Sequence, residues 1–176
     1  MKKLAFVLLV PFSLLSSGNV FAQYDGGDKL LNAGVGLNTR YSGGLPITSS
    51  FEYGITNNIS AGVGLEFITN TYRTSGPNYG YTVFSFGARV SYHINKLLKL
   101  EMEKLDLYIG GGVGYRVFNW NDKKGTYYPI GNAYGSNIFL GAHAGARYYL
   151  MPTVGAFVEV GVNGAVVAST GVAFRF

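Results

Sequence analysis

Eight charged residues in this sequence have the types and spacing to form ion pairs inside a folded sheet. Each shares one side of an alternating run with glycine, serine and asparagine; the eight are Arg40, Glu52, Glu66, Arg89, Arg116, Arg147, Glu159 and Arg175. Residues at alternate positions of a strand point to the same side. Opposite charges buried together attract each other, and removing one partner leaves a costly unpaired charge. We therefore expect a buried cluster of ion pairs, with a gated ion path as the alternative.

Two pairs are expected within this cluster. A short turn should place Arg147 beside Glu159 on neighbouring strands. Glu52 and Arg89 should face each other across Gly62, which lies on the strand between them. The glycine would leave room for the two long side chains to meet.

The histidines and glycine-rich segments give little support for catalysis. Ser91 and His93 share a side, but residues two apart on a strand lie about 6.5–7 Å apart, which is beyond hydrogen-bond reach. Two separated histidines and no cysteine do not supply a metal site. The glycines at 110–114 lack the helix and lysine that follow a phosphate-binding loop. We therefore expect no catalytic residue, no cofactor and no metal.

Alternation of apolar and polar residues continues through eight runs, which is the pattern of strands with two different faces. The runs cover residues 31–40, 47–55, 59–67, 82–93, 105–117, 137–148, 154–163 and 166–176. Each is close to the length of about 9–11 residues that crosses a bilayer as a tilted strand. Turn residues occupy 56–58 and 151–153, and longer polar stretches occupy 70–78 and 119–135. Residues 95–104 fit either an extended hairpin end or a short amphipathic helix.

Composition excludes several classes of protein. Of 176 residues, 26 are glycine, 15% are aromatic and only 13% are charged, which argues against a disordered chain or a coiled coil. The absence of cysteine excludes disulfides and thiol chemistry. The net charge of +5 is modest and its lysines and arginines are scattered, so we expect no nucleic-acid partner.

The first 22 residues have the organisation of a secretory signal peptide. Lys2 and Lys3 precede a short apolar stretch at 4–15, and Val20 and Ala22 suit cleavage before Gln23. The apolar stretch is shorter than the about 20 residues of a spanning helix, although an uncleaved helical anchor is the alternative. Residues 23–176 then form one barrel domain.

The composition of the polar face decides between two kinds of barrel. A soluble lipocalin-like barrel would carry its apolar face inside and charged residues outside. Here the polar face is mostly glycine, serine and asparagine with almost no lysine, which suits a crowded lumen. Aromatic residues near the run ends, such as Tyr53, Tyr92 and Tyr148, suit the membrane interface. The sequence therefore predicts an all-β, eight-stranded, antiparallel, up-and-down transmembrane barrel.

Three segments carry a family resemblance: Gly-Ala-Arg-Tyr-Tyr at 145–149, Phe-Val-Glu-Val-Gly at 157–161 and the final six residues. With the leader, they make the chain resemble the small eight-stranded outer-membrane barrels, the group that includes the OmpA transmembrane domain, OmpX and NspA. In that family a terminal phenylalanine after alternating apolar residues is read by the barrel-assembly machinery. The resemblance implies that role here for Thr170, Val172, Phe174 and Phe176.

The expected function is that of a non-enzymatic protein of the bacterial outer membrane, with a structural or surface-interaction role. Trp120, Tyr127 and Tyr128 in the longest polar stretch are the candidate contacts for an extracellular ligand. Expected partners are outer-membrane lipid, lipopolysaccharide and the assembly machinery. A narrow pore and a lipid-modifying enzyme are the alternatives.

Overall fold

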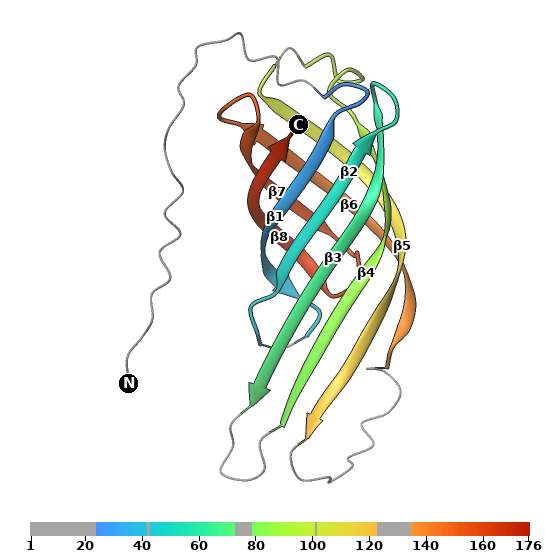
Figure 1. Ribbon diagram of the computed structural model, residues 1–176, viewed down its shortest axis with the longest axis vertical. Helices are drawn as coiled ribbons and strands as arrows, with labels where there is room; N and C mark the ends of the chain where they lie inside the picture. The colour runs from blue at the N-terminus through green and yellow to red at the C-terminus, as the bar shows by residue number, and fades with distance from the viewer. Residues whose placement is uncertain (1–23, 42, 73–78, 101, 123–134) are drawn as a thin grey trace, which may run out of the picture.

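The computed structural model describes residues 24–41, 43–72, 79–100, 102–122 and 135–176, and the predicted leader lies outside them. Eight antiparallel strands form a closed up-and-down barrel in chain order, as predicted (Figure 1). The strands are β1 (Lys29–Thr39), β2 (Ile47–Gly54), β3 (Ile59–Tyr72), β4 (Tyr79–His93), β5 (Leu105–Asp122), β6 (Asn137–Tyr149), β7 (Val154–Gly161) and β8 (Val166–Arg175).

The barrel closes where the first strand pairs with the last. Leu30 lies opposite Arg175 in this seam. One step further, Lys29 and Phe176 exchange two backbone hydrogen bonds of 3.1 and 3.0 Å. The final residue of the chain therefore completes the ladder, and closure leaves no sheet edge along the seam, as a lipid environment requires.

Alternation along each strand separates an apolar outer face from a polar inner face. Val63 and Val158 lie on the outer face and are more than half exposed, whereas the inward Glu52, Ser91 and Arg147 are fully buried. This arrangement is the inverse of a soluble barrel and is that of a transmembrane one. Among the described residues, no helix is long and apolar enough to cross a membrane.

The middle strands are longer than the sequence predicts. β3 and β4 extend to Tyr72 and from Tyr79, and β5 runs through to Asp122, so three strands project beyond β1, β2, β7 and β8 at the end opposite the C-terminus (Figure 1). Trp120 was expected in a loop, but it lies on strand β5. The connections expected at 70–78 and 119–135 therefore begin only after Tyr72 and Asp122.

Polarity reverses at the base of this projection. One row of outward residues is apolar (Phe67, Phe84 and Val117), and the next outward row is polar (Thr69, Thr82 and Asn119). On the inner side, a polar row of Glu66, Ser85 and Arg116 is followed by the apolar row Ile68, Val83 and Phe118. The reversal indicates that the projecting sheet has water, and not lipid, outside it.

The inward apolar residues form one cluster, which we call the apolar cluster. It comprises Ile68, Tyr81, Val83, Phe118, Ala165 and Val166, with Tyr41 packed against it. Strict alternation over residues 166–176 would put Val166 on the outer side with Val172 and Phe174, but Val166 is buried in this cluster. The physical reason for Val166 is a pair of register shifts in the β1–β8 ladder, between Gly36 and Thr39, which change the side that Val166 faces.

Residues 95–104 form neither a strand nor a helix among their described members. The Leu98 N–H donates to the Ile94 carbonyl (3.0 Å), and Lys99 has a φ of 51°. Asn95 is buried, and its side chain bonds the backbone of Leu105 and Leu107 at the start of β5. The segment is therefore a compact turn fastened to β5 by one asparagine.

Candidate functional site

Glu52 is the centre of a buried charge network inside the barrel. Arg89 Nε lies 3.3 Å and Arg147 Nη2 lies 2.9 Å from Glu52 Oε1. The expected pair of Glu52 and Arg89 is present, with Gly62 opposite both residues in the β2–β3–β4 register. A Cβ atom at Gly62 would overlap the Phe51 carbonyl, so this position admits no side chain.

Glu159 pairs with Arg89 and not with Arg147, so the expected Arg147–Glu159 pair is wrong. Arg89 donates to both carboxylate oxygens of Glu159, at 2.7 and 3.2 Å. The β6–β7 register puts Glu159 opposite Gly145 and Arg147 opposite Phe157, which offsets the two charges by two residues. Arg89 reaches Glu159 across the lumen, from β4 to β7.

Arg147 binds a second carboxylate that the expected cluster omitted. Its guanidinium donates to Asp106 Oδ2 (2.8 Å) and to Asn32 Oδ1 (3.0 Å), and its Cζ lies 4.1 Å from the Tyr108 ring centre. Tyr108 in turn donates to Glu159 Oε2 at 2.9 Å. Asp106 and Tyr108 alternate with the lipid-facing residues of their run, and this alternation could have identified both.

A serine, a histidine and an aspartate form a hydrogen-bonded chain at the edge of this network. His93 Nδ1 is 2.6 Å from Asp106 Oδ1, and His93 Nε2 is 3.0 Å from Ser60 Oγ. Ser60 donates its hydroxyl hydrogen bond to Glu52 Oε2, 2.6 Å away. A nucleophilic serine needs a histidine that accepts its proton, whereas this hydroxyl hydrogen is directed at a carboxylate.

The Ser91–His93 pair considered from the sequence does not form. Ser91 instead bonds His143 Nε2 on β6, at 2.9 Å. Ser60, Ser91, His93 and His143 are all buried inside the barrel, on the side away from lipid. The hydroxyl groups therefore serve as hydrogen-bond partners within the lumen. We refer to this whole set, Asn32, Glu52, Ser60, Arg89, Ser91, His93, Asp106, Tyr108, His143, Arg147 and Glu159, as the lumen network.

Tyr24 closes the end of the lumen that carries the termini. Its ring stacks on His93 with centres 3.4 Å apart and planes within 4°. Its hydroxyl lies 2.8 and 2.6 Å from the carbonyls of Thr56 and Ile59. Burial, followed by the nearby Asp28, raises the pKa of Tyr24 well above its usual range, so the hydroxyl remains a donor.

Glu66 and Arg116 hold the β7–β8 turn over the opposite end. Glu66 Oε2 accepts the backbone N–H groups of Ala165 (2.7 Å) and Val166 (3.3 Å). Arg116 donates to the Gly164 carbonyl (3.4 Å) and to Asn137 Oδ1 (2.8 Å). Gly164 has a φ of 87°, a left-handed conformation that favours glycine. The two charged side chains therefore hold this turn in place.

Arg40 and Arg175 lie outside the expected cluster. Arg40 follows the end of β1 and is exposed, and its backbone N–H donates to the Ala165 carbonyl at 2.9 Å. Arg175 lies at the rim, where it donates to the Pro152 carbonyl (3.1 Å) and its Cζ lies 5.0 Å from the Tyr149 ring centre. Six of the eight predicted charges thus face the lumen as expected, while Arg175 lies at its mouth and Arg40 is exposed.

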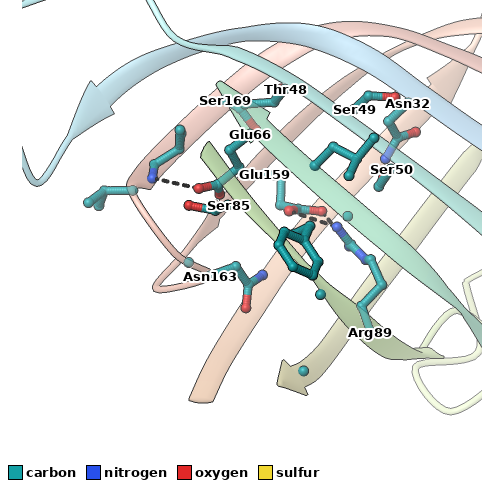
Figure 2. A pocket seen from close by; sticks show the side chains of 18 of the residues that line it. Asn32, Thr48, Ser49, Ser50, Glu66, Ser85, Arg89, Glu159, Asn163 and Ser169 are labelled. Carbon is teal, nitrogen blue, oxygen red and sulfur yellow. Dashed lines mark hydrogen bonds and ion pairs between the residues drawn. The ribbon is translucent and has the colours of Figure 1, made fainter. Parts of the chain in front are cut away.

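Between the two closed ends lies a small cavity, which Figure 2 shows with its polar lining. Its volume is about 60 Å³, and its wall includes Asn32, Thr48, Glu66, Arg89 and Glu159. Such a volume holds a few water molecules and no larger solute.

Of the candidate loop contacts, only Trp120 is described. Its side chain is 52% exposed, and its ring meets Phe118 edge-on with centres 5.0 Å apart. Tyr127 and Tyr128 lie outside the described residues. Trp120 therefore extends the apolar cluster towards the surface of the projecting sheet.

The four residues of the expected assembly signal occupy the outer side of β8. Phe174 and Phe176 stack with ring centres 6.4 Å apart, and Val172 is exposed. Thr170 donates its hydroxyl to the Phe157 carbonyl at 2.8 Å, which satisfies its only polar group against lipid. The residues thus form a continuous strip beside the seam; their role in assembly stays a prediction.

Among the described residues, no group of three or more histidine, cysteine or acidic side chains has the arrangement to hold a metal ion.

Comparison with solved structures finds small transmembrane barrels. The chain is similar to Neisserial surface protein A (NspA), with 18% identity, a TM-score of 0.58, and 86% of this chain and 98% of that chain covered. It is also similar to Ail, the attachment invasion locus protein of Yersinia pestis, with 15% identity, a TM-score of 0.52, and 86% and 99% covered. The structural neighbours are therefore small eight-stranded outer-membrane barrels.

A designed protein is also similar. A de novo transmembrane β-barrel has 19% identity, a TM-score of 0.52, and 88% of this chain and 99% of that chain covered. No protein-family model matches the chain, and no curated protein matches its sequence. Since a designed barrel matches with the same TM-score as Ail, the likeness shows the fold alone.

Proposed function

We propose that the protein is a non-enzymatic barrel of the bacterial outer membrane that acts through its extracellular end. In this proposal residues 1–22 are a cleaved export signal and both ends of the mature chain lie in the periplasm. The observation that carries it is the contrast between a filled lumen and a projecting sheet of β3, β4 and β5 with a polar outer surface. Two of the structural neighbours are bacterial outer-membrane proteins, which supports the location.

The lumen argues for a role at the surface and against conduction. The lumen network and Tyr24 fill the periplasmic half, and the turn held by Glu66 and Arg116 covers the other end. Eight strands enclose only enough space for side chains. Planar-bilayer recordings of the purified protein should show no stable openings, and frequent openings would favour the pore alternative.

An enzymatic role has no support in the lumen chemistry. Ser60 is fully buried and donates a hydrogen bond to Glu52, whereas a lipid substrate would approach from the outer face. Mass spectrometry of lipid A from strains with and without the gene tests this alternative directly. Identical lipid A profiles are expected.

Partners follow from the position of each surface. The apolar outer face would contact outer-membrane lipid, and the exposed Arg40 and polar outer row would lie where lipopolysaccharide is found. The strip of Thr170, Val172, Phe174 and Phe176 would contact the barrel-assembly machinery during insertion.

Surface interaction is tested with the barrel in nanodiscs on a glycan array and on immobilised host-matrix proteins. Trp120→Ala should lower any binding by about tenfold, since exposed tryptophan is a common anchor of recognition surfaces. Leu140→Ala, which changes an exposed residue of the lipid-facing side, is the matched control and should have no effect. A barrel that binds none of these probes, while its loss weakens detergent resistance of the envelope, would favour a purely structural role.

A further inference from the structure

The turn between β4 and β5, residues 94–104, has no part in the proposal above. It lies at the end of the barrel that carries the termini. The two other turns at that end, 55–58 and 150–153, contain no charged residue. This turn contains Lys96, Lys99 and Lys104 together with two glutamates. The difference singles out one sector of the rim.

Three apolar side chains of this turn are exposed. Leu97 is 67%, Leu98 51% and Met102 52% accessible. Their exposure is fixed by the fold, because the buried Asn95 accepts the Leu107 N–H at 2.6 Å and also bonds the Leu105 carbonyl. The turn thus exposes apolar side chains in a segment that also carries three lysines.

The turn adjoins the lipid-facing surface. The carbonyl of Lys104 accepts the Tyr149 N–H at 2.8 Å, so Lys104 lies beside the end of β6. The outward side chains on either side of Tyr149 are Tyr148 and Leu150, which are 45% and 68% exposed. Leu105, the first residue of β5 after the turn, pairs with Tyr148. The apolar outer face therefore continues directly up to the turn.

We propose that this turn binds phospholipids of the periplasmic leaflet, with its lysines on headgroup phosphates and its leucines at the acyl boundary. Exposed leucine and methionine interleaved with lysine are the pattern of an interfacial segment. Lysine places its stem along apolar surface and its ammonium group in the headgroup region. Outward tyrosines such as Tyr148 mark that same depth. The turn thereby ties one side of the barrel to the inner leaflet.

The chain contains no cysteine, so a single introduced thiol can report depth. Leu97→Cys carrying a bimane label, folded into lipid vesicles, should emit at shorter wavelength than in detergent and be quenched by lipids brominated near the headgroup. Thr153→Cys on the uncharged β6–β7 turn is the matched control, since Thr153 is also exposed. Its label should remain accessible to aqueous iodide.

Charge is tested by combining Lys96→Gln, Lys99→Gln and Lys104→Gln, all at exposed positions. A lysine near an anionic surface contributes up to about fivefold in binding. The triple variant should therefore lose the preference for phosphatidylglycerol over phosphatidylcholine that native mass spectrometry measures for the wild type. Retained heat-modifiability on gels shows that it is folded.

Two outcomes would overturn this inference. One is equal exposure of labels at 97 and 153 to iodide in vesicles, which would indicate an aqueous turn or a site for a periplasmic protein. The other is an unchanged lipid preference in the triple variant. Neither outcome bears on the extracellular role, because these readouts concern the opposite end of the barrel.

Discussion

The two halves of the barrel interior solve the same packing problem with opposite chemistry. In the half nearest the termini, the lumen network packs charged and polar side chains against one another, as with Arg147 between Glu52 and Asp106. In the half that carries the projecting sheet, the apolar cluster packs Ile68, Val83 and Phe118. The change takes place within one step of β3, between Glu66 and Ile68.

This difference teaches that the medium outside the sheet determines what lies inside. Where lipid covers the outer face, the apolar residues are outside and the interior receives the polar ones. Where water covers it, the ordinary soluble arrangement returns, with Thr69 and Thr82 outside. Four comparisons between variants follow from this contrast.

The largest effect is expected from Arg147→Met. Arg147 is fully buried and pairs with both Glu52 and Asp106, so its loss removes the guanidinium from the buried Asp106 and leaves Glu52 with Arg89 alone. We expect a loss of about 3–5 kcal/mol in the free energy of unfolding, measured by urea titration in lipid vesicles. Glu159→Gln should cost less, because Arg89 keeps Glu52 at 3.3 Å. Equal effects would show that the network does not act through these pairs.

The second substitution separates the two media. Val158→Arg places a cation on the lipid-facing side of β7 and should cost about 2–4 kcal/mol. Thr69→Arg places the same charge on the outer side of β3 beyond the reversal of polarity, and should cost less than about 1 kcal/mol. Similar losses at both positions, measured by the same titration, would mean that the reversal does not mark the water boundary.

A smaller effect is expected in the apolar cluster. Ile68→Val removes one methylene group from a fully buried side chain, which typically costs about 0.5–1.5 kcal/mol. Leu65→Val changes an outward residue on the same strand, where lipid can fill the space, and should have a lesser effect. If Leu65→Val proved the more costly, the assignment of inner and outer faces would be wrong.

The smallest effect on stability is expected from Phe176→Ala. The backbone of Phe176 pairs with Lys29, so this variant keeps the seam and removes only an exposed ring. The unfolding free energy should change little, while the amount of folded barrel in the outer membrane falls severalfold if the ring is read during assembly. Deleting Phe176 removes the ring and both hydrogen bonds, and comparing the two variants separates recognition from closure.

The eight-stranded barrel could be predicted from the sequence because the alternation of apolar and polar residues is visible within each strand, without knowing which residues pair between strands. Alternation along each strand is enough to predict that Glu52, Arg89, Arg147 and Asp106 point inward. Alternation does not predict which of these charges form pairs. The expected partner of Arg147 was wrong because the β6–β7 register differs by two residues from the one assumed.

Contacts across the lumen were inaccessible for a further reason. Besides Glu52, Arg89 contacts Glu159 on the opposite side of the lumen, because a long side chain in a narrow barrel can reach the opposite wall. The positions of Arg40 and Val166 were missed because the β1–β8 register shifts carry no residue signature in a stretch rich in glycine and asparagine. Ser60 and His93 were missed as partners because they lie on different strands.

Arg147 also bears on the order of folding. It bonds Asn32 and Glu52, which precede it by 115 and 95 residues, and thereby joins the two ends of the chain across the interior. Contacts between such distant residues form late, because a long loop must first be closed. The hairpins can form locally, but the central cations find their carboxylates only as the first and last strands meet. Reopening the seam must then separate these pairs while they are still shielded from water, which makes unfolding slow.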